Sequence, residues 1–394
     1  KNFATRRLRL VGDVALACAF VTYSGPFNSE FRDKLSYELF LNDVHERKLP
    51  SSDRVNLVEF LVDEGTIGEW SLEGLPTDDL SIQNGIMVTR SSRYPLMIDP
   101  QGQALFWIKN KEQARINQDP AMCVTTLSNK MLKDQLDCTM SQGLCLIIEN
   151  VENEVDPMLD PVLEKAVVKK ASNRFVIRVG DQNMDYDPAF CLYMTSRLPN
   201  PHFSPELSAK TTVIDFTVTL KGLEQQLLGR VLNMEQRVLE ETLAALKEEG
   251  TLNTKSLLLL GQQLLERLSN ATGNLLDDTE LIEVLANTKA KAKEVEGKLA
   301  EARERTLEID EKREQFRPVA TRGSIMYFNM TDMILVSNPI TLQPSGWMYN
   351  CSLDQFLQQF DYSIRTSEKC QPTSKRVDKI ISHLTYQAYR YMNR

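Results

Sequence analysis

The alternation of short apolar runs with helical stretches over residues 91–220 is the feature that most constrains the fold. Such runs, bounded by turn residues, are typical of buried strands. The expected strands are residues 95–99, 123–127, 144–149, 190–195 and 212–218. The expected helices between them are residues 104–111, 129–141 and 157–171, and a β-hairpin is expected around Gly180 and Asp181. This alternation predicts an α/β fold in which a parallel sheet is covered by helices on both faces.

The turn after the first strand is the place where nucleotide-binding α/β modules carry a phosphate loop. Its residues here are Asp99, Pro100, Gln101, Gly102 and Gln103. The turn has one glycine, no lysine and a proline that removes a backbone donor, whereas a phosphate loop reads G-x-x-x-x-G-K-[ST]. A triphosphate loses its main electrostatic clamp without that lysine and a nest of N–H groups. The pattern predicts a nucleotide-module scaffold with an inactive site, and so a mechanical role.

The strand at residues 144–149 looks like the acidic strand that would face this turn. It ends in Glu149, which is able to hold a magnesium-bound water, followed by Asn150. Asn150 stands where a hydrolytic acid would be expected, so no side chain is evident that would orient an attacking water. Two interpretations stay open here: a structural relic of a nucleotide site, or a divergent nucleotide-binding ATPase module.

Residues 220–317 contain no proline and are rich in Leu, Glu, Lys, Ala and Gln. Their second half repeats with spacings of four and three, which is typical of a coiled-coil seam. The seam is Leu281, Leu285, Thr288, Ala292, Val295, Leu299, Ala302, Thr306, Ile309, Arg313 and Phe316. Because several of these residues are small or polar, the seam needs a close partner. The expected partner is the first half, through Leu227, Val231, Met234, Val238 and a patchier run to Leu265. An antiparallel hairpin is predicted, with an ordinary helical bundle as the alternative.

Composition excludes several other classes of protein. The net charge of -8 argues against a nucleic-acid binder, and no apolar run reaches the roughly 18 residues of a membrane span. Seven cysteines without a C-x-x-C motif fit a reducing compartment, and three isolated histidines (His45, His202 and His383) predict no metal site. We interpret the basic start and the apolar run after it as a buried helix, not a signal peptide. The helix expected from residue 375 to the last residue suggests a piece of a longer protein.

Several segments in order along the chain resemble the fifth AAA+ module of dynein heavy chains. They are GLPTDDLSIQNG (74–85), RYPLMIDPQ (93–101), DPMLD (156–160), DFTVT (215–219) and RPVATRGS (317–324). The segments LLGRV (227–231) and RGSI (322–325) are most similar to the axonemal heavy chains of the outer dynein arm. The resemblance covers nearly the whole chain.

The resemblance implies a domain organisation. Residues 1–50 would be the helical end of the stalk and the connection from the preceding module, and residues 51–220 the large AAA+ subdomain with degenerate nucleotide motifs. Residues 221–317 would be the coiled-coil buttress and its base. Residues 318–394 would be the small helical subdomain and the start of the link to the next module.

The resemblance also implies a function. The fifth module binds no nucleotide in this family and would be no enzyme by itself, while ATP and Mg²⁺ act in other modules of the parent motor. Its partners would be the neighbouring AAA+ modules and the stalk of the same heavy chain, with intermediate and light chains and microtubules reached through the parent complex. The expected location is the cytoskeleton of a cilium or flagellum, the axoneme. A standalone coiled-coil scaffold is a further alternative.

One segment departs from the family pattern. The family runs a continuous helix where this chain has residues 337–346, which include Pro339 and Pro344. Proline inside a helix removes a hydrogen bond and clashes with the preceding turn. We therefore expect the helix to be interrupted there by an inserted segment.

Overall fold

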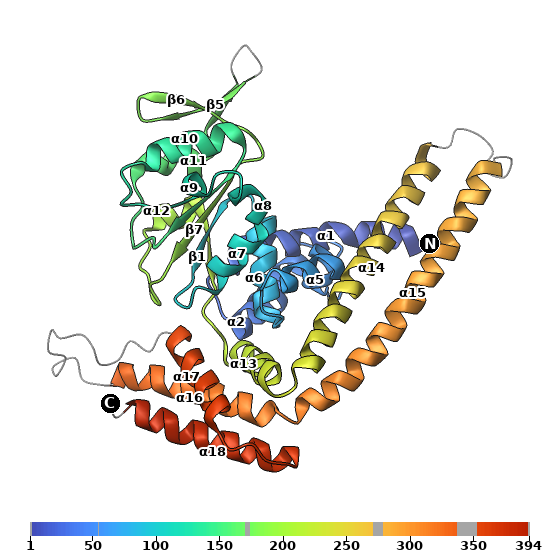
Figure 1. The fold of residues 1–394 in the computed structure, drawn as a ribbon. Helices are drawn as coiled ribbons and strands as arrows, with labels where there is room; N and C mark the ends of the chain where they lie inside the picture. The colour runs from blue at the N-terminus through green and yellow to red at the C-terminus, as the bar shows by residue number, and fades with distance from the viewer. Residues whose placement is uncertain (1, 54, 170–173, 271–278, 337–352, 393–394) are drawn as a thin grey trace. The chain divides into compact units, whose positions relative to one another are not determined.

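The computed structural model describes the chain apart from residues 1, 54, 170–173, 271–278, 337–352 and 393–394 (Figure 1). The chain divides into two compact units. Unit 1 consists of Lys1–Asp63 and Glu73–Val218, and unit 2 consists of Glu64–Leu72 and Thr219–Arg394. The interruption expected at residues 337–346 lies outside the described residues.

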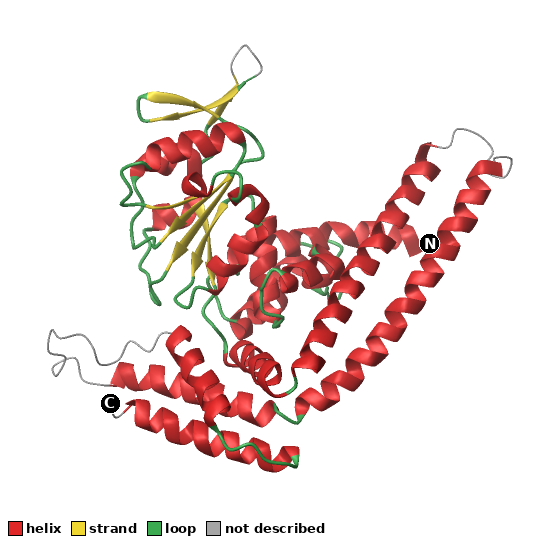
Figure 2. Ribbon diagram, in the orientation of Figure 1, coloured by secondary structure: helices red, strands yellow, loops and turns green. Residues whose placement is uncertain are grey.

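A parallel five-stranded sheet is the centre of unit 1 (Figure 2). Its strands are β1 (Tyr94–Ile98), β2 (Val124–Thr126), β3 (Cys145–Glu149), β7 (Cys191–Ser196) and β8 (Thr211–Asp215). The order across the sheet is β2-β3-β7-β1-β8, and every neighbouring pair is parallel. The expected fold class is confirmed. The last strand is shorter than predicted, because the carboxylate of Asp215 accepts a hydrogen bond from Thr217 N at 2.8 Å and turns the chain.

Both faces of this sheet are buried, which explains why its strands read as nearly continuous apolar runs. Helices lie on either side of the strands (Figure 2). They are α6 (Asp79–Arg90), α7 (Gln103–Lys111), α8 (Gln113–Ile116), α9 (Pro120–Cys123), α10 (Leu132–Gln142) and α12 (Pro205–Lys210). Leu96, Ile148 and Met194 are fully buried in one apolar core with Leu136 and Met140 of α10. This core holds the strand ends, and hence the turns beyond them, in fixed positions.

One long helix and several short ones precede the sheet in unit 1. They are α1 (Asn2–Tyr23), α2 (Ser29–Asp33), the π-helix η1 (Lys34–Phe40), α3 (Leu41–Glu46) and α4 (Leu57–Leu61). The fully buried Arg32 joins this region to the sheet. It donates to Gly25 O at 2.9 Å and to Asn84 Oδ1 at 2.7 Å, and Asn84 in turn donates to Asp215 O at 2.7 Å. Burial lowers the pKa of Arg32 to about 10, while the nearby Asp215 raises it.

A small antiparallel sheet, β4 (Val167–Lys169), β5 (Phe175–Val179) and β6 (Gln182–Asp185), contains the expected hairpin. The helix predicted for residues 157–171 is wrong from residue 164 to residue 169. Among the described residues of this segment, only the 3-10 turn η2 (Pro157–Leu159) and α11 (Asp160–Leu163) are helical. Lys165 then takes a positive φ of 52°, and β4 pairs with β5 through Val167 and Ile177. Pairing with a distant strand overrides the local helical pattern.

Unit 2 is helical. Its elements are α5 (Glu64–Leu72), α13 (Leu220–Glu235), α14 (Arg237–Asn270), α15 (Thr279–Glu314), α16 (Arg317–Val336), α17 (Leu353–Thr366) and α18 (Thr373–Met392). Helix α13 packs on α16, and α14 packs on α15. The side chain of Arg376 fixes the end of α13 against the loop before α18. It binds both carboxylate oxygens of Glu235, at 2.6 and 3.0 Å, and Ser367 Oγ at 2.9 Å.

Candidate functional site

The turn between β1 and α7 is closed by its own first residue. Asp99 is 1% exposed, and its carboxyl group accepts hydrogen bonds from the backbone N–H groups of Gln103 at 2.8 Å and Leu105 at 2.9 Å. These donors belong to the first turn of α7, where backbone N–H groups have no partner within the helix. A phosphate bound to such a turn would use the same donors. Asp99 therefore occupies the hydrogen-bonding positions that an anionic ligand would need.

The surroundings of Asp99 set its protonation. Burial raises the pKa of the Asp99 carboxyl, and the N–H groups of residues 102–105 lower it by less. The donors thus recover part of the free energy lost when the carboxylate leaves water. Burial and hydrogen bonding therefore act in opposite directions on the pKa of Asp99, and burial has the larger effect.

The other residues of the turn serve its conformation. Gly102 has a φ of 78°, a left-handed conformation that favours glycine. Pro100 supplies no N–H, and Gln101 Oε1 accepts a hydrogen bond of 3.4 Å from Val218 N. Gln103 Nε2 is buried with no hydrogen-bond partner among the described residues. The hydrogen bonds of the turn thus run to groups of the protein itself.

The acidic strand β3 ends close to α7. Lys109 Nζ of α7 lies 2.6 Å from Glu149 Oε1, and the Glu149 side chain is 17% exposed. Asn150 follows with a φ of 56°, and Val151 N then donates to Thr195 O at 2.8 Å. The structure therefore brings Glu149 next to a lysine of the helix after the turn. In this geometry Lys109 neutralises the carboxylate that the sequence suggested for a magnesium-bound water.

Sequence reasoning did not single out Lys109. The available signal was its spacing: Lys109 follows Gly102 by seven residues, which places the two on the same side of a helix. A lysine two turns into the helix is a different arrangement from a phosphate-loop lysine, which lies at the helix start. Its partner is consequently a protein carboxylate.

The predicted seam of α15 is the less exposed side of that helix. Ala292, Val295, Leu299, Ala302 and Thr306 are partly buried, while most of their neighbours are exposed. Ile309 (7% exposed) and Phe316 (2% exposed) are buried at the base. The side chains of Leu281, Leu285 and Thr288 lie outside the described residues. Between residues 292 and 316 the burial pattern is that of a helix packed along one stripe.

The expected partner of this seam needs a correction. Leu227 and Val231 are buried, but they belong to α13, which packs on α16. Val238 is 76% exposed and Leu265 is 66% exposed on α14, so neither lies in the seam. A break at Gln236, where φ is -142° and ψ is 57°, separates α13 from α14 and changes the direction of the chain. The periodic pattern of α13 therefore does not continue into the hairpin.

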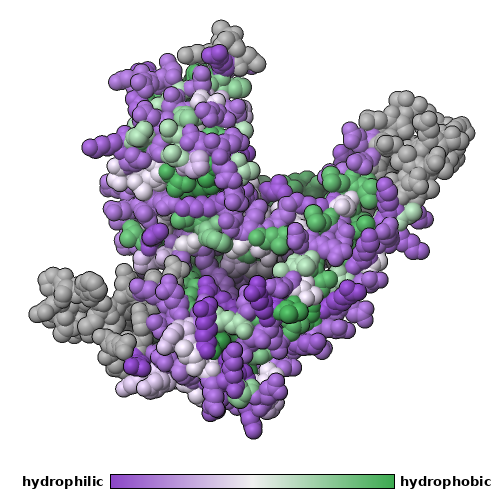
Figure 3. Space-filling model, viewed as in Figure 1, coloured by the Kyte–Doolittle hydropathy of each residue, from purple (hydrophilic) through white to green (hydrophobic). Residues whose placement is uncertain are grey.

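The base of the hairpin combines apolar packing with a charged pair. Leu243 of α14 is 2% exposed, like Phe316. Arg313 takes a seam position, where its Nε lies 3.7 Å from Glu240 Oε2 of α14 and its Nη1 lies 3.1 Å from Asp310 Oδ1. A charged pair within an apolar seam favours one register of two helices. Apolar surface also lies between the charged side chains of the hairpin (Figure 3). Leu252 and Leu259 of α14 are exposed.

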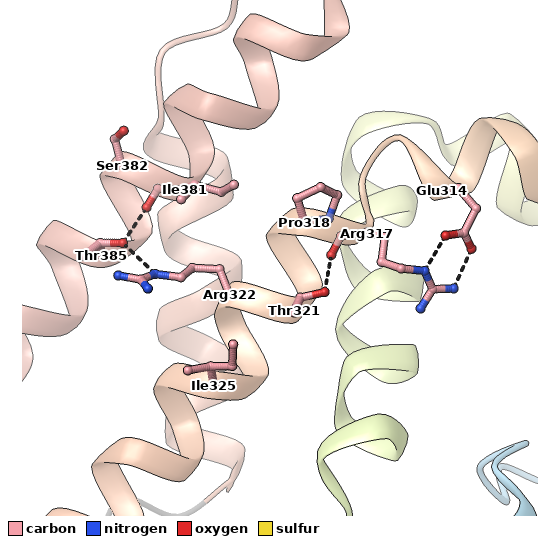
Figure 4. A pocket seen from close by; sticks show the side chains of 9 residues that line it. All are labelled: Glu314, Arg317, Pro318, Thr321, Arg322, Ile325, Ile381, Ser382 and Thr385. Carbon is pink, nitrogen blue, oxygen red and sulfur yellow. Dashed lines mark hydrogen bonds and ion pairs between the residues drawn. The ribbon is translucent and has the colours of Figure 1, made fainter.

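An open groove of about 840 Å³ lies between α16 and α18 within unit 2 (Figure 4). Arg322 reaches across it to Thr385, with 3.4 Å between Nε and Oγ1. Arg317 at one end is paired with Glu314 and, at 2.8 Å, with Glu224. The arginines of this groove thus bind groups of the protein itself.

The described part of the chain contains no group of three or more His, Cys, Asp or Glu side chains placed to share a metal ion. None of its helices combines the length and apolarity needed to span a bilayer.

The parallel sheet, the turn at the carboxyl end of β1 and the helices that follow define a module of the AAA+ type without a phosphate-loop lysine. Comparison with known proteins agrees. Residues 68–295 match the family described as the ATP-binding dynein motor region. The chain belongs to this family.

Individual relatives are dynein heavy chains. The chain is 49% identical to dynein axonemal heavy chain 5 of Mus musculus over 394 residues. It is 47% identical to the dynein gamma chain of the flagellar outer arm of Chlamydomonas reinhardtii over 395 residues, and 46% identical to dynein axonemal heavy chain 8 of Homo sapiens over 391. These alignments cover 99–100% of this chain and 8% of each relative. The chain thus spans about a twelfth of the length of these relatives.

Proposed function

We propose that this chain is a non-catalytic AAA+ module in the motor region of an axonemal dynein heavy chain, equivalent to the fifth module of the ring. It acts as a mechanical relay in ciliary or flagellar motility. Movements driven by ATP hydrolysis in other modules displace this one, and the α14–α15 hairpin passes the displacement to the stalk that binds microtubules. The similarity to axonemal and flagellar outer-arm heavy chains supports this location and role.

The Asp99 carboxyl group carries the proposal that the module does not read nucleotide. It takes the N–H donors of the first turn of α7, and the turn has no lysine. An incoming phosphate would have to displace a buried carboxyl group and would meet no cation of the turn. The pair between Lys109 and Glu149 removes a second element that ATP hydrolysis would require.

The α14–α15 hairpin supports the relay. Two helices packed along a stripe and registered by Arg313 and Glu240 transmit displacement along their axes as one element. We assign residues 221–317 to the buttress and its base, and residues 318–394 to the small subdomain and the link to the next module. Residues 1–50 are assigned to the end of the stalk and residues 51–220 to the large subdomain. The partners are accordingly the neighbouring modules and the stalk, with microtubules and the intermediate and light chains reached through the parent complex.

Equilibrium binding of a fluorescent ATP analogue with Mg²⁺ tests the first part. The purified chain is expected to show no saturable binding up to millimolar nucleotide. Saturable binding that excess ATP displaces and that Glu149→Gln abolishes would overturn this part. It would instead identify a divergent ATPase module.

Nucleotide-dependent microtubule affinity of the complete heavy chain tests the second part. Leu299→Pro breaks α15 within the seam and is expected to uncouple microtubule binding from the ATPase cycle. Leu299→Asp, which places a charge in the seam, is expected to weaken the coupling, whereas Leu307→Asp, at a position 67% exposed, leaves it intact. Unchanged coupling in the Leu299→Pro motor would contradict the relay.

A further inference from the structure

Helix α5 belongs to one unit by packing and to the other by chain connectivity. It occupies Glu64–Leu72 and is part of unit 2, yet the residues directly before and after it, Asp63 and Glu73, are part of unit 1. A segment of nine residues thus leaves unit 1, packs in unit 2 and returns. Any displacement between the two units acts on both ends of this helix.

In unit 2, α5 packs against α14, the first helix of the hairpin. The contact is made at Gly68, where a β-carbon would lie 2.4 Å from Thr251 Oγ1. The Thr251 hydroxyl is held in place because it donates to Lys247 O at 2.8 Å. Absence of a side chain at residue 68 therefore allows the two helices to approach this closely.

An ion pair adds to this contact. Lys255, one turn beyond Thr251 on α14, pairs with Glu69 of α5, and both side chains are partly exposed. Trp70, the next residue of α5, is 4% exposed. Gly68 and Glu69 thus hold α5 in unit 2 by close approach and by charge.

In unit 1, the residue after α5 is anchored on α7. Glu73 O accepts a hydrogen bond of 2.7 Å from Asn110 Nδ2, and Glu73 Oε2 accepts one of 3.1 Å from Trp107 Nε1. Trp107 is fully buried, so this anchor is part of the module core. Helix α7 is the helix whose first turn binds Asp99.

We propose that α5 is a strap that couples α7 of the AAA+ module to the α14–α15 hairpin, with Gly68, Thr251 and Glu73 as its positioning residues. The inference rests on the proposed relay function. Gly68 and Glu73 are five residues apart, a length of about 8 Å along a helix. A short link fixed at both ends transmits displacement with little slack, whereas a long loop would absorb it. The strap therefore gives the hairpin a second connection to the module besides the chain that leads into α13.

A substitution with a designed rescue tests this coupling. Gly68→Ala places a methyl group against Thr251 Oγ1 and Cγ2, at 2.4 and 3.2 Å, and so separates α5 from α14. Adding Thr251→Ala removes both atoms and leaves the nearest contact, to the β-carbon of residue 251, at 3.3 Å. Gly250→Ala is the matched control. Gly250 lies on the same helix as Thr251, and a β-carbon there would meet no atom within 4 Å.

Two readouts separate a coupling role from a packing role. Hydrogen exchange of α14 in the purified chain reports the contact, and the nucleotide-dependent change in microtubule affinity of the complete heavy chain reports coupling. Gly68→Ala is expected to accelerate exchange around Thr251 and to reduce the affinity change about fivefold, the lower end of typical allosteric couplings. The Gly68→Ala/Thr251→Ala double variant should restore both values, whereas Gly250→Ala should leave the affinity change intact and should not accelerate exchange, because alanine favours the helix.

Faster exchange with an unchanged affinity difference would overturn the strap, since the contact would then be packing alone. Unchanged exchange would overturn it as well, since the close approach would not hold α14. The Leu299→Pro motor distinguishes the two proposals. If that motor loses coupling while Gly68→Ala keeps it, the relay stands and the strap fails; if both keep coupling, the relay itself fails.

Discussion

Lys109 Nζ lies 2.6 Å from Glu149 Oε1, which joins the helix after the β1 turn to the end of the acidic strand. Glu149 is 17% exposed, so its charge is partly removed from water. A cation that the protein itself supplies therefore stabilises this carboxylate. The pair stabilises the edge of the sheet where a nucleotide site would need an acid free to act.

Lys109→Ala is expected to lower the free energy of unfolding of unit 1 by about 1 kcal/mol, because it leaves a half-buried carboxylate without its cation. Urea unfolding followed by circular dichroism measures the change. Lys130→Ala, at an exposed lysine in the loop before α10, is the control and should stay within about 0.5 kcal/mol of the parent chain. Equal stability of the two variants would show that the ion pair contributes nothing.

At a pH above the folded-state pKa of Asp99, Asp99→Asn is expected to lower stability by about 1 kcal/mol, because the ionised carboxyl group presents two acceptor oxygens and an amide presents one. The effect should depend on pH. The folded-state pKa of Asp99 is raised above its ordinary 3.8, so between these two values the folded chain binds more protons than the unfolded chain. The advantage of the parent over Asp99→Asn should be largest below pH 3.8 and should decrease as pH rises through the folded-state pKa.

Unfolding midpoints of the parent and the Asp99→Asn chain across this range provide the check. Asp137→Asn, at an exposed position of α10, controls for the loss of one carboxylate. If the stability of the parent relative to Asp99→Asn grew with rising pH, the folded-state pKa of Asp99 would be lowered and not raised. This result would mean that the N–H donors outweigh burial at Asp99.

Ile309→Ala is expected to destabilise the hairpin base by about 2–4 kcal/mol, the usual range for truncating a buried aliphatic residue. Ile309 is 7% exposed in the seam, whereas Leu307 on the same helix is 67% exposed. Leu307→Ala should therefore change stability by no more than about 0.5 kcal/mol. Thermal unfolding of both variants gives the comparison. Similar losses in the two would contradict the assigned face of α15.

Arg376→Lys is expected to destabilise unit 2 by about 1–3 kcal/mol although it keeps the charge. An ammonium group cannot reproduce the two parallel bonds to Glu235 together with the bond to Ser367. Lys379→Arg, where the side chain is 55% exposed and pairs with Glu368 at 2.8 Å, should be nearly neutral. Denaturation midpoints test this, and a neutral Arg376→Lys change would show that charge alone is sufficient at this site.

The sequence predicted much of this fold because local patterns carry it. The runs that became β1, β3 and β7 are nearly continuous apolar runs, as is typical of strands buried on both faces. Proline at residue 100 and the missing lysine indicate a turn unsuited to phosphate from the sequence alone. The seam from Ala292 to Phe316 followed from a spacing that only a helix satisfies.

Other features depended on residues far apart in the sequence. The segment at residues 157–171 had a helical pattern, yet pairing of Val167 with Ile177 placed part of it in a sheet. Val238 continued the spacing of α13, yet a break at Gln236 left it exposed. No local rule selects between a helix and a strand when a distant partner supplies the hydrogen bonds.

The sequence by itself determined the class of module, the absence of a lysine in the β1 turn and the stripe along which α15 packs. Each of these depends on composition or on periodicity within a few turns of chain. Only the tertiary structure decided that Asp99 takes the donors of α7, that Lys109 neutralises Glu149 and that α5 lies on α14 at Gly68. These contacts depend on where the folded backbone places each side chain, to within the length of a hydrogen bond, and periodicity does not carry that information.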